Sequence, residues 1–224
     1  MSDTLTLNSL PLFPLDTVLY PGGLLSLQIF EVRYLDMVGK CHKTGAPFGI
    51  VSLTEGSEVQ KPERAAAPSG QPRGDGFASE AFHEVGTLAT ITDFSVPQAG
   101  LMLIQCRGLQ RFRITRREKL RHGLWIADVV EQAGDVDVAI PPDLQKAAEA
   151  LGKLIARLRQ DKTPPEKMPM LAPYRLDDCG WVANRWCELL PMPVALKQQL
   201  MALDNPLLRL ELVCDILERT GISI

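Results

Sequence analysis

The spacing of apolar residues changes along this chain, and each change predicts a different kind of element. Apolar and polar residues alternate at 25–29, the period-two pattern of a half-buried strand. An earlier apolar stretch, 10–15, contains two prolines that cannot donate backbone hydrogen bonds, so we expect it at a sheet edge or a strand entrance. The Pro-Gly-Gly sequence at 21–23 predicts the turn that joins the two strands.

Helical spacing follows the second strand. Glu31 would open this helix, since a carboxylate suits the partial positive charge of a helix N-terminus. The residues that recur at helical spacing are Tyr34, Leu35, Val38 and either Cys41 or His42. Further strands are predicted at 48–53, 85–95, 101–106, 108–114 and 125–130, with a hairpin connection at 96–100. Six or so strands with one early helix predict a closed or nearly closed β-barrel.

The second half of the chain has the 3.6-residue period of helices. Asp143 is the expected N-cap of a helix that ends before Asp161. Its apolar stripe comprises Leu144, Ala147, Ala148, Leu151, Leu154, Ile155 and Leu158. Three more helices are expected after the capping or opening residues Asp177-Asp178, Pro193 and Asn205-Pro206. The sequence therefore predicts an α+β protein, with a β-barrel subdomain at 1–135 and a helical bundle subdomain at 136–224.

One stretch, about 56–80, differs in composition from the rest of the expected barrel. It is rich in Gln, Lys, Pro, Ala, Ser and Gly and has few apolar residues, so burial cannot offset the entropy of ordering it. We expect a mobile loop. Its length is that of an insertion or a functional arm, and insertion is the simpler interpretation.

Two sequences near the start of the chain are distinctive: LPLFPLDTVLYPGG (10–23) and LQIFEVRYLDMV (27–38). Together they resemble the opening of the Lon amino-terminal domain, the substrate-recognition module of Lon proteases. The stretch 108–114 resembles the G-x-x-R-F-x-I strand of that family, and WVANRWCELLP (181–191) resembles its helical half. Val32 stands where the family often has proline. The resemblance implies a PUA-like β-barrel or pseudobarrel with one early helix, followed by a helical bundle, and recognition of unfolded or partner polypeptides.

Composition narrows the classes of function. A formal net charge of −3 argues against a dedicated nucleic-acid binder. The five cysteines are an odd number in apolar contexts, which is typical of buried thiols in a reducing compartment. The start of the chain lacks the pattern of a leader, and no apolar run reaches the ~20 residues of a membrane span. We therefore expect a cytoplasmic protein that makes no membrane contact.

The sequence shows no signature of catalysis. It contains neither a G-x-x-x-x-G-K-[ST] phosphate loop nor a G-x-S-x-G elbow, and its three histidines lack metal-ligand spacing. Adjacent Cys41 and His42 are better explained as a core cysteine beside a surface histidine than as a nucleophile and base. The pair Asp177-Asp178 is better explained by helix capping than by a metal site. We expect no enzyme activity, no cofactor and no metal.

Candidate binding residues gather at the first helix and on the 108–114 strand. They are Glu31, Arg33, Tyr34, Arg111 and Phe112, and we expect them near a crevice where the barrel meets the helices, the usual place for a ligand. An ion pair internal to the fold, between Glu31 and Arg33 and including Arg111, explains the charged members equally well. On a strand Arg111 would face solvent and Phe112 the core.

A basic strip within 107–121 suggests an alternative function. Its basic residues outside the binding set are Arg107, Arg113, Arg116, Arg117, Lys119 and Arg121. Guanidinium groups in a row could contact an RNA backbone or an acidic peptide, although a solvated strand face is the favoured interpretation. Trp181 and Trp186 lie five residues apart, so one of them could face outward as a protein-contact anchor; core packing is favoured for both.

Overall fold

The computed structural model describes residues 5–55, 80–164 and 167–221. By internal contacts the chain forms two units, one comprising Met1–Leu19 and Leu25–Gln132, the other Tyr20–Leu24 and Ala133–Ile224. The expected loop at 56–80 lies outside the described residues except for Glu80. The division into subdomains at 135 stays a prediction about independent folding.

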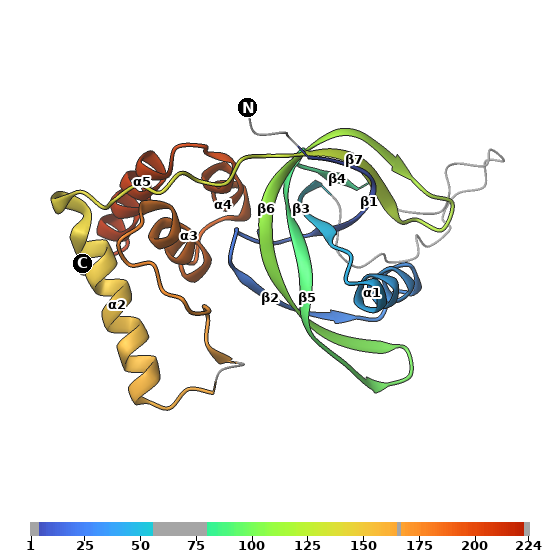
Figure 1. Ribbon diagram of the computed structural model, residues 1–224, viewed down its shortest axis with the longest axis horizontal. Helices are drawn as coiled ribbons and strands as arrows, with labels where there is room; N and C mark the ends of the chain where they lie inside the picture. The colour runs from blue at the N-terminus through green and yellow to red at the C-terminus, as the bar shows by residue number, and fades with distance from the viewer. Residues whose placement is uncertain (1–4, 56–79, 165–166, 222–224) are drawn as a thin grey trace, which may run out of the picture. The chain divides into compact units, whose positions relative to one another are not determined.

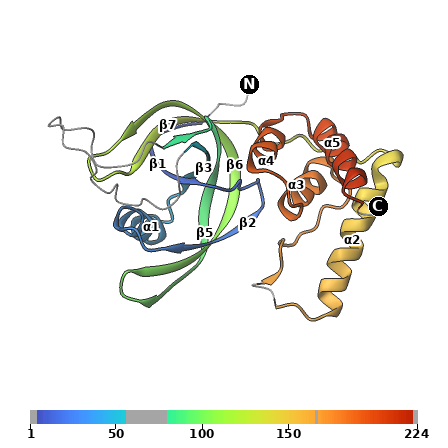
Figure 2. The ribbon, with the colours of Figure 1, turned by 180° about the vertical axis from the view of Figure 1, so that it is seen from behind.

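The strands belong to the first unit, and most of the helices belong to the second, so the α+β class is confirmed (Figures 1 and 2). The strands are β1 (Thr6–Leu15), β2 (Leu24–Ile29), β3 (Phe48–Glu55), β4 (Ala81–Phe82), β5 (Val85–Gln98), β6 (Leu101–Lys119) and β7 (Trp125–Glu131). The helices are α1 (Val32–Thr44), the 3-10 turn η1 (Pro142–Leu144), α2 (Gln145–Gln160), α3 (Cys179–Leu189), α4 (Val194–Ala202) and α5 (Pro206–Arg219).

The sheet closes on itself. Its strands follow the order β1-β7-β6-β5-β3-β4, and β1 also pairs with β3 in parallel, which completes the ring. The prediction that β1 is an edge strand or a strand entrance is therefore wrong. Its first part, Thr6 to Leu12, pairs with β7, and its last part, Leu12 to Leu15, pairs with β3. Pro11 thus lies in the part of β1 that pairs with β7, and Pro14 in the part that pairs with β3. Each part pairs on one side, so the N–H that proline lacks is tolerated on the other side.

The β5–β6 hairpin is longer than the sequence predicted. Its strands continue to Gln98 and resume at Leu101, so Ala99-Gly100 forms the turn, and β6 is one strand of 19 residues where we expected two. Gly100 has a φ of +79°, a conformation that glycine adopts without strain. Register shifts interrupt the ladder at three points, and such irregularities let long strands bend around a barrel.

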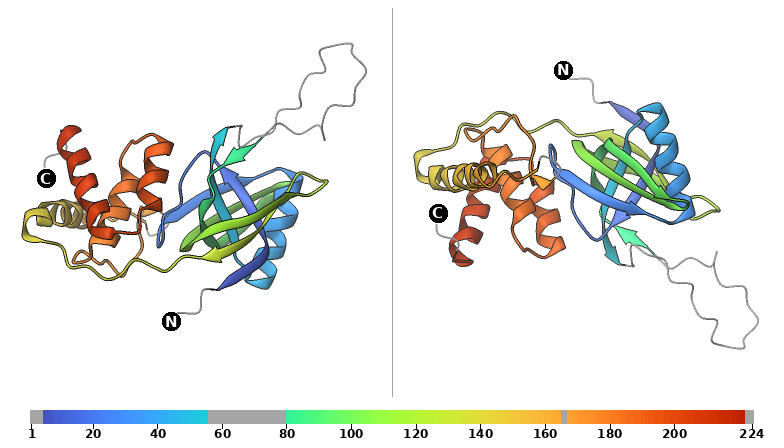
Figure 3. Two further views of the ribbon diagram at one scale, coloured as in Figure 1. Left: turned by 90° about the horizontal axis from the view of Figure 1, so that it is seen from above. Right: turned by 90° about the horizontal axis from the view of Figure 1, so that it is seen from below.

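Two apolar clusters fill the barrel unit. The first joins the buried face of α1, including Tyr34, Met37 and Val38, to the strands beside it (Figure 3). The second surrounds Phe112, which is fully buried. A Cβ at Gly86 would stand 2.6 Å from the Phe112 ring and 2.5 Å from the backbone oxygen of Ile50. The centre of the barrel therefore admits a phenylalanine only because a glycine faces it.

We expect Gly86→Ala to lower the free energy of unfolding by about 2 kcal/mol or more, because backbone at 2.5 Å cannot yield to the added methyl. Gly134→Ala is the matched control, since nothing lies within 4 Å of a Cβ there. Urea unfolding of both variants measures the difference. Equal midpoints would show that the barrel centre relaxes around the methyl group.

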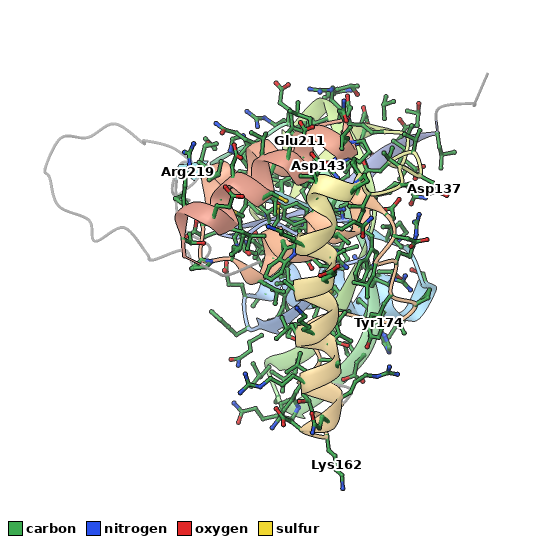
Figure 4. All side chains as sticks on the ribbon, turned by 90° about the vertical axis from the view of Figure 1, so that its left-hand side faces the viewer. Asp137, Asp143, Lys162, Tyr174, Glu211 and Arg219 are labelled. Carbon is green, nitrogen blue, oxygen red and sulfur yellow. The ribbon has the colours of Figure 1, made fainter. Side chains whose placement is uncertain are left out.

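The helical unit follows the predicted apolar stripe. Ala147, Ala148, Leu151 and Ile155 of α2 are buried. Figure 4 shows this helix facing the viewer, with Asp143 at its upper end, Lys162 at its lower end and Tyr174 beside it. Asp143 is not the N-cap, because the chain first makes the η1 turn and α2 starts after Leu144. None of the helices in the described ranges has both the length and the apolar character that crossing a bilayer requires.

The starts of α3 and α5 are capped as predicted, whereas Pro193 is at the uncapped N-cap position of α4 instead of in its first turn. The Asp178 side chain accepts a hydrogen bond from the Trp181 backbone N–H at 2.7 Å, and the Asn205 side chain accepts from the first turn of α5. Trp186 is buried and its indole donates to the Ala147 carbonyl, whereas Trp181 is half-buried. Core packing of Trp186 is therefore confirmed.

Arg209 of α5 is buried and uses all five of its N–H donors. Nη1 donates to Asp135 at 2.5 Å and to Asn184 of α3 at 3.0 Å, and Nε donates to the Leu200 carbonyl at 3.0 Å. Nη2 donates to Asp135 and to the Leu203 carbonyl. One guanidinium thus joins α5, α3, the end of α4 and the segment that precedes η1.

A lysine cannot replace this fork, since an ammonium has three donors at a single point. We expect Arg209→Lys to lower the free energy of unfolding by about 2–4 kcal/mol, because the three donors of an ammonium leave at least two of the five contacts unmade. Arg157→Lys, on an arginine whose side chain is 82% exposed, is the control and should change it little. Thermal melts followed by circular dichroism compare the two variants, and similar shifts would contradict the assignment.

Arg185 of α3 holds the turn between β1 and β2. The turn has proline at its second position and Gly22 at its third with a φ of +73°, and the Gly23 N–H donates to the Tyr20 carbonyl at 2.9 Å. Arg185 donates to the carbonyls of Pro21 and Gly22 at 2.9 and 2.7 Å. These contacts explain why Tyr20–Leu24 groups with the helices.

Candidate functional site

A cavity with a volume of about 870 Å³ lies in the barrel unit at the start of α1. Its apolar lining comes from β1, the start and middle of α1 and the turn before β7, and its polar lining is of mixed charge. The residues that line it are Pro11, Phe30, Glu31, Val32, Arg33, Asp36, Met37, Lys40, Cys41, His122 and Leu124. We call this cavity the α1 pocket.

Two large apolar side chains at the α1 pocket face solvent. Phe30 is 52% exposed and Val32 is 74% exposed, and they flank Glu31, the N-cap residue of α1. Water contact with side chains of this size has a free-energy cost of roughly 1 kcal/mol each, which a bound apolar group would relieve. Exposed apolar residues beside a concave apolar surface are typical of binding sites.

Arg33 holds the walls of the α1 pocket together. Its side chain is only 4% exposed, and it donates to Glu31 at 3.1 Å, to the Gly123 carbonyl at 2.7 Å and to Glu80 at 3.1 Å. Gly123 lies in the turn between β6 and β7, next to the lining residue Leu124. The guanidinium therefore ties α1 to the opposite wall of the cavity.

Glu80 completes this network from a third part of the chain. Its carboxylate is 2% exposed and accepts from Arg33 and from the Trp125 indole, the latter at 2.7 Å, while the Lys119 ammonium lies 3.8 Å away. The predicted internal pair of Glu31 and Arg33 is present, and the third charged group recorded with it is Glu80. Sequence reasoning missed Glu80, because it stands at the end of a stretch whose composition is that of a loop.

Burial tunes the charged and thiol groups of the pocket. It raises the pKa of Glu31, and Arg33 partly counteracts this rise. Burial alone would lower the pKa of Arg33, but Tyr34, Glu80 and Glu31 outweigh it and raise that pKa. Burial also raises the pKa of the Cys41 thiol, so its nucleophilic thiolate form is disfavoured. Cys41 is buried and His42 is exposed, stacked on Phe94 at 4.1 Å between ring centroids, as predicted.

A second, smaller cavity of about 260 Å³ adjoins the first, and the two share Phe30 and Glu31 in their linings. We call it the β2 pocket. Its lining residues are Phe13, Leu15, Ser26, Leu27, Gln28, Ile29, Phe30, Glu31 and Tyr34. Tyr34 is buried and stacks on Phe13 with ring centroids 4.0 Å apart.

The structure brings together three of the five candidate binding residues. Glu31 and Arg33 line the α1 pocket and Tyr34 lines the β2 pocket. Arg111 and Phe112 are buried and line neither pocket. The expectation that Arg111 faces solvent is wrong, because tertiary packing covers both faces of β6 at this point: Arg111 is 4% exposed, and Phe112 on the opposite face is fully buried. Direct contact of these two residues with a partner stays a prediction. The site residues that we missed are Phe30 and Val32, whose only signal was an apolar pair around Glu31.

The arginines of the basic strip outside the binding set are exposed, and two of them contact neighbouring aromatic or carboxylate groups. Arg117 lies over the Phe82 ring at 4.7 Å and over the Trp125 ring at 5.9 Å. Arg116 pairs with Glu118 at 4.0 Å with both side chains mostly in solvent. Arg107 and Arg113 are exposed on β6. This arrangement is that of a solvated strand face with local partners.

Other candidate chemistry has a structural explanation. All five cysteines are free thiols in buried positions. Asp178 caps α3 and contacts Arg175 at 3.1 Å. Among the described residues, no group of three or more His, Cys, Asp and Glu side chains is placed to hold a metal ion.

A sheet closed between β1 and β3, one early helix and a following helical unit define a mixed barrel and helix class of domain. The family model of the ATP-dependent protease La (LON) substrate-binding domain matches residues 9–219, and the chain belongs to this family. The resemblance seen in the sequence is confirmed.

Solved structures agree. The chain is similar to the crystal structure of a Lon N-terminal domain protein from Xanthomonas campestris, with a TM-score of 0.69 and 29% identity over 93% of this chain and 98% of that chain. It shares its fold with the N-terminal domain of Mycobacterium avium complex Lon protease, with a TM-score of 0.55 and 16% identity over 96% of this chain and 100% of that one. Among curated proteins, the comparison finds no match. The comparisons give no support for RNA binding.

We expect Glu80→Gln to lower the free energy of unfolding by about 2–4 kcal/mol, because it removes the charge that balances the buried Arg33 while Glu31 remains. Chemical denaturation measures the change, and Trp125 fluorescence reports whether the indole keeps its acceptor. Glu84→Gln, on an exposed glutamate nearby in the sequence, is the matched control. Equal stability of the two variants would mean that the network does not need this charge.

Proposed function

We propose that this chain is a non-catalytic module that binds unfolded or partner polypeptides through apolar side chains seated in the α1 pocket. The observation that carries the proposal is the exposure of Phe30 and Val32 at the mouth of an 870 Å³ cavity with a largely apolar lining. Membership of a substrate-binding domain family supports the same class of ligand.

The energetics suit reversible recognition. Covering two half-exposed apolar side chains contributes about 2–3 kcal/mol, and seating one ligand side chain in the cavity contributes about 2 kcal/mol more. After the cost of ordering an extended segment, such a site binds weakly, with dissociation constants of roughly micromolar to millimolar. Weak binding suits a module that contacts many unfolded segments in turn, because each segment must dissociate before the next can bind.

The charges at the α1 pocket favour breadth over sequence specificity. Asp36 and Lys40 are both exposed, one turn apart on α1, and His122 lies on the facing turn. Because both signs are present, the rim neither attracts nor repels strongly charged segments as a class. Apolar content of the polypeptide should therefore govern affinity.

The buried thiols support a reducing compartment, and we place the protein in the cytoplasm as part of this proposal.

Val32→Ser is expected to weaken binding of an unfolded, casein-like polypeptide about five- to tenfold, since it removes roughly 1 kcal/mol or more of apolar contact. It should leave the melting temperature unchanged, because Val32 is 74% exposed. Val136→Ser, on a valine that is 68% exposed in the other unit, is the matched control and should bind normally. Fluorescence anisotropy measures both affinities. Equal affinities for the two variants would overturn the proposal.

A further inference from the structure

We propose that the bound polypeptide is extended and adds as a strand to the edge of β2 that no other described strand occupies, with one apolar side chain in the α1 pocket and a second in the β2 pocket. This inference rests on the proposed function and gives it a binding mode. It follows from three features of the barrel unit: the shared border of the pockets, the lining of the β2 pocket, and the strands with which β1 and β2 each pair.

The two pockets form one continuous site. Both include Phe30 and Glu31, the residues between the end of β2 and the start of α1. The Glu31 carboxylate at this border is paired with Arg33 at 3.1 Å, so a chain that crosses it does not meet an unbalanced charge. An apolar segment can therefore pass from one pocket to the other.

The lining of the β2 pocket shows that it meets the edge of the strand. Six consecutive residues, 26–31, line it, and the first four of them belong to β2. Side chains of a strand alternate between two faces, so a pocket on one face would touch every second residue only. A cavity that touches consecutive residues lies along the backbone, where N–H and C=O groups can pair with a ligand.

Strand pairing leaves this edge available. The partner of β2 within the described sheet is β6, which occupies one of its two edges. On the far wall of the β2 pocket stand Phe13 and Leu15, in the part of β1 that pairs with β3 while β7 pairs with the earlier part. An extended polypeptide that enters here gains main-chain hydrogen bonds as well as apolar contacts.

The occupant is an extended, uncharged segment with two apolar side chains on the same face. Phe13, Leu15 and Leu27 give the β2 pocket an apolar wall, and its small volume suits one side chain. Same-face residues of a strand are an even number of positions apart, so ligands with apolar residues at i and i+2 or i and i+4 should bind better than those at i and i+3. A helical ligand would show the opposite preference for i+3 over i+2.

The decisive experiment uses the full chain and fluorescein-labelled nine-residue peptides of Ser, Thr and Gln with two leucines at each spacing. The best peptide is then N-methylated at one amide at a time. In a strand alternate amides face the partner, so methylation at every second position should weaken binding at least tenfold, and methylation at the positions between should change it less than twofold.

Protein variants locate the second anchor. Leu27→Ser alters the β2 pocket but not the α1 pocket. It should lower the affinity for the two-leucine peptide about fivefold and leave the affinity for a one-leucine peptide unchanged. Leu25→Ser, on a half-buried leucine of β2 that lines neither pocket, is the control and should leave both unchanged.

Each contrary outcome has a distinct meaning. Uniform tolerance of N-methylation, or tighter binding at i+3 spacing than at i+2, overturns strand addition. Binding of casein-like polypeptide that still depends on Val32 leaves the proposed function standing. A dimer in sedimentation that the peptide dissociates would assign the β2 edge to a second copy of the chain and overturn the choice of occupant. Failure of Val32→Ser to affect casein-like polypeptide removes the proposed function itself.

Discussion

Burial of the Arg33 guanidinium is the constraint on which the candidate site depends. A charge removed from water needs acceptors on every side, and here they come from α1 itself, from the turn before β7 and from Glu80. Because these segments are far apart in the sequence, satisfying one side chain fixes the separation of the pocket walls. The polar contacts of Arg33 thus set the width of the cavity, although the lining of the cavity is largely apolar.

The same principle organises the helical unit. Arg209 and Arg185 are buried arginines whose donors reach several segments, including backbone carbonyls at the ends of elements. Carbonyls at helix ends and in turns lack regular partners, and a guanidinium fork can satisfy several at once. The chain therefore places arginine where irregular backbone must be buried.

Local patterns in the sequence predicted the elements well. The alternation of β2, the Pro-Gly-Gly turn, the α2 stripe and the caps Asp178 and Asn205 each depend on a few neighbouring residues, and the structure has them. The role of β1 and the length of the β5–β6 hairpin depend on distant partners, and there the predictions were wrong. For the site, Glu31 and Arg33 were found through motif resemblance, whereas exposure of Phe30 and burial of Arg111 are set by tertiary packing that periodicity alone does not encode.

The turn Tyr20–Leu24 has a consequence for the order of events on the ribosome. Its partners, Arg185 and the Lys197 carbonyl that accepts from the Tyr20 hydroxyl at 2.6 Å, are synthesised more than 160 residues later. During synthesis from the N-terminus, β1, β2 and their connecting turn are therefore made before the hydrogen-bond partners of the turn exist. The turn must stay accessible until α3 and α4 have been synthesised. Only when the helical unit is complete can the turn near the start of the chain form its hydrogen bonds with Arg185 and Lys197.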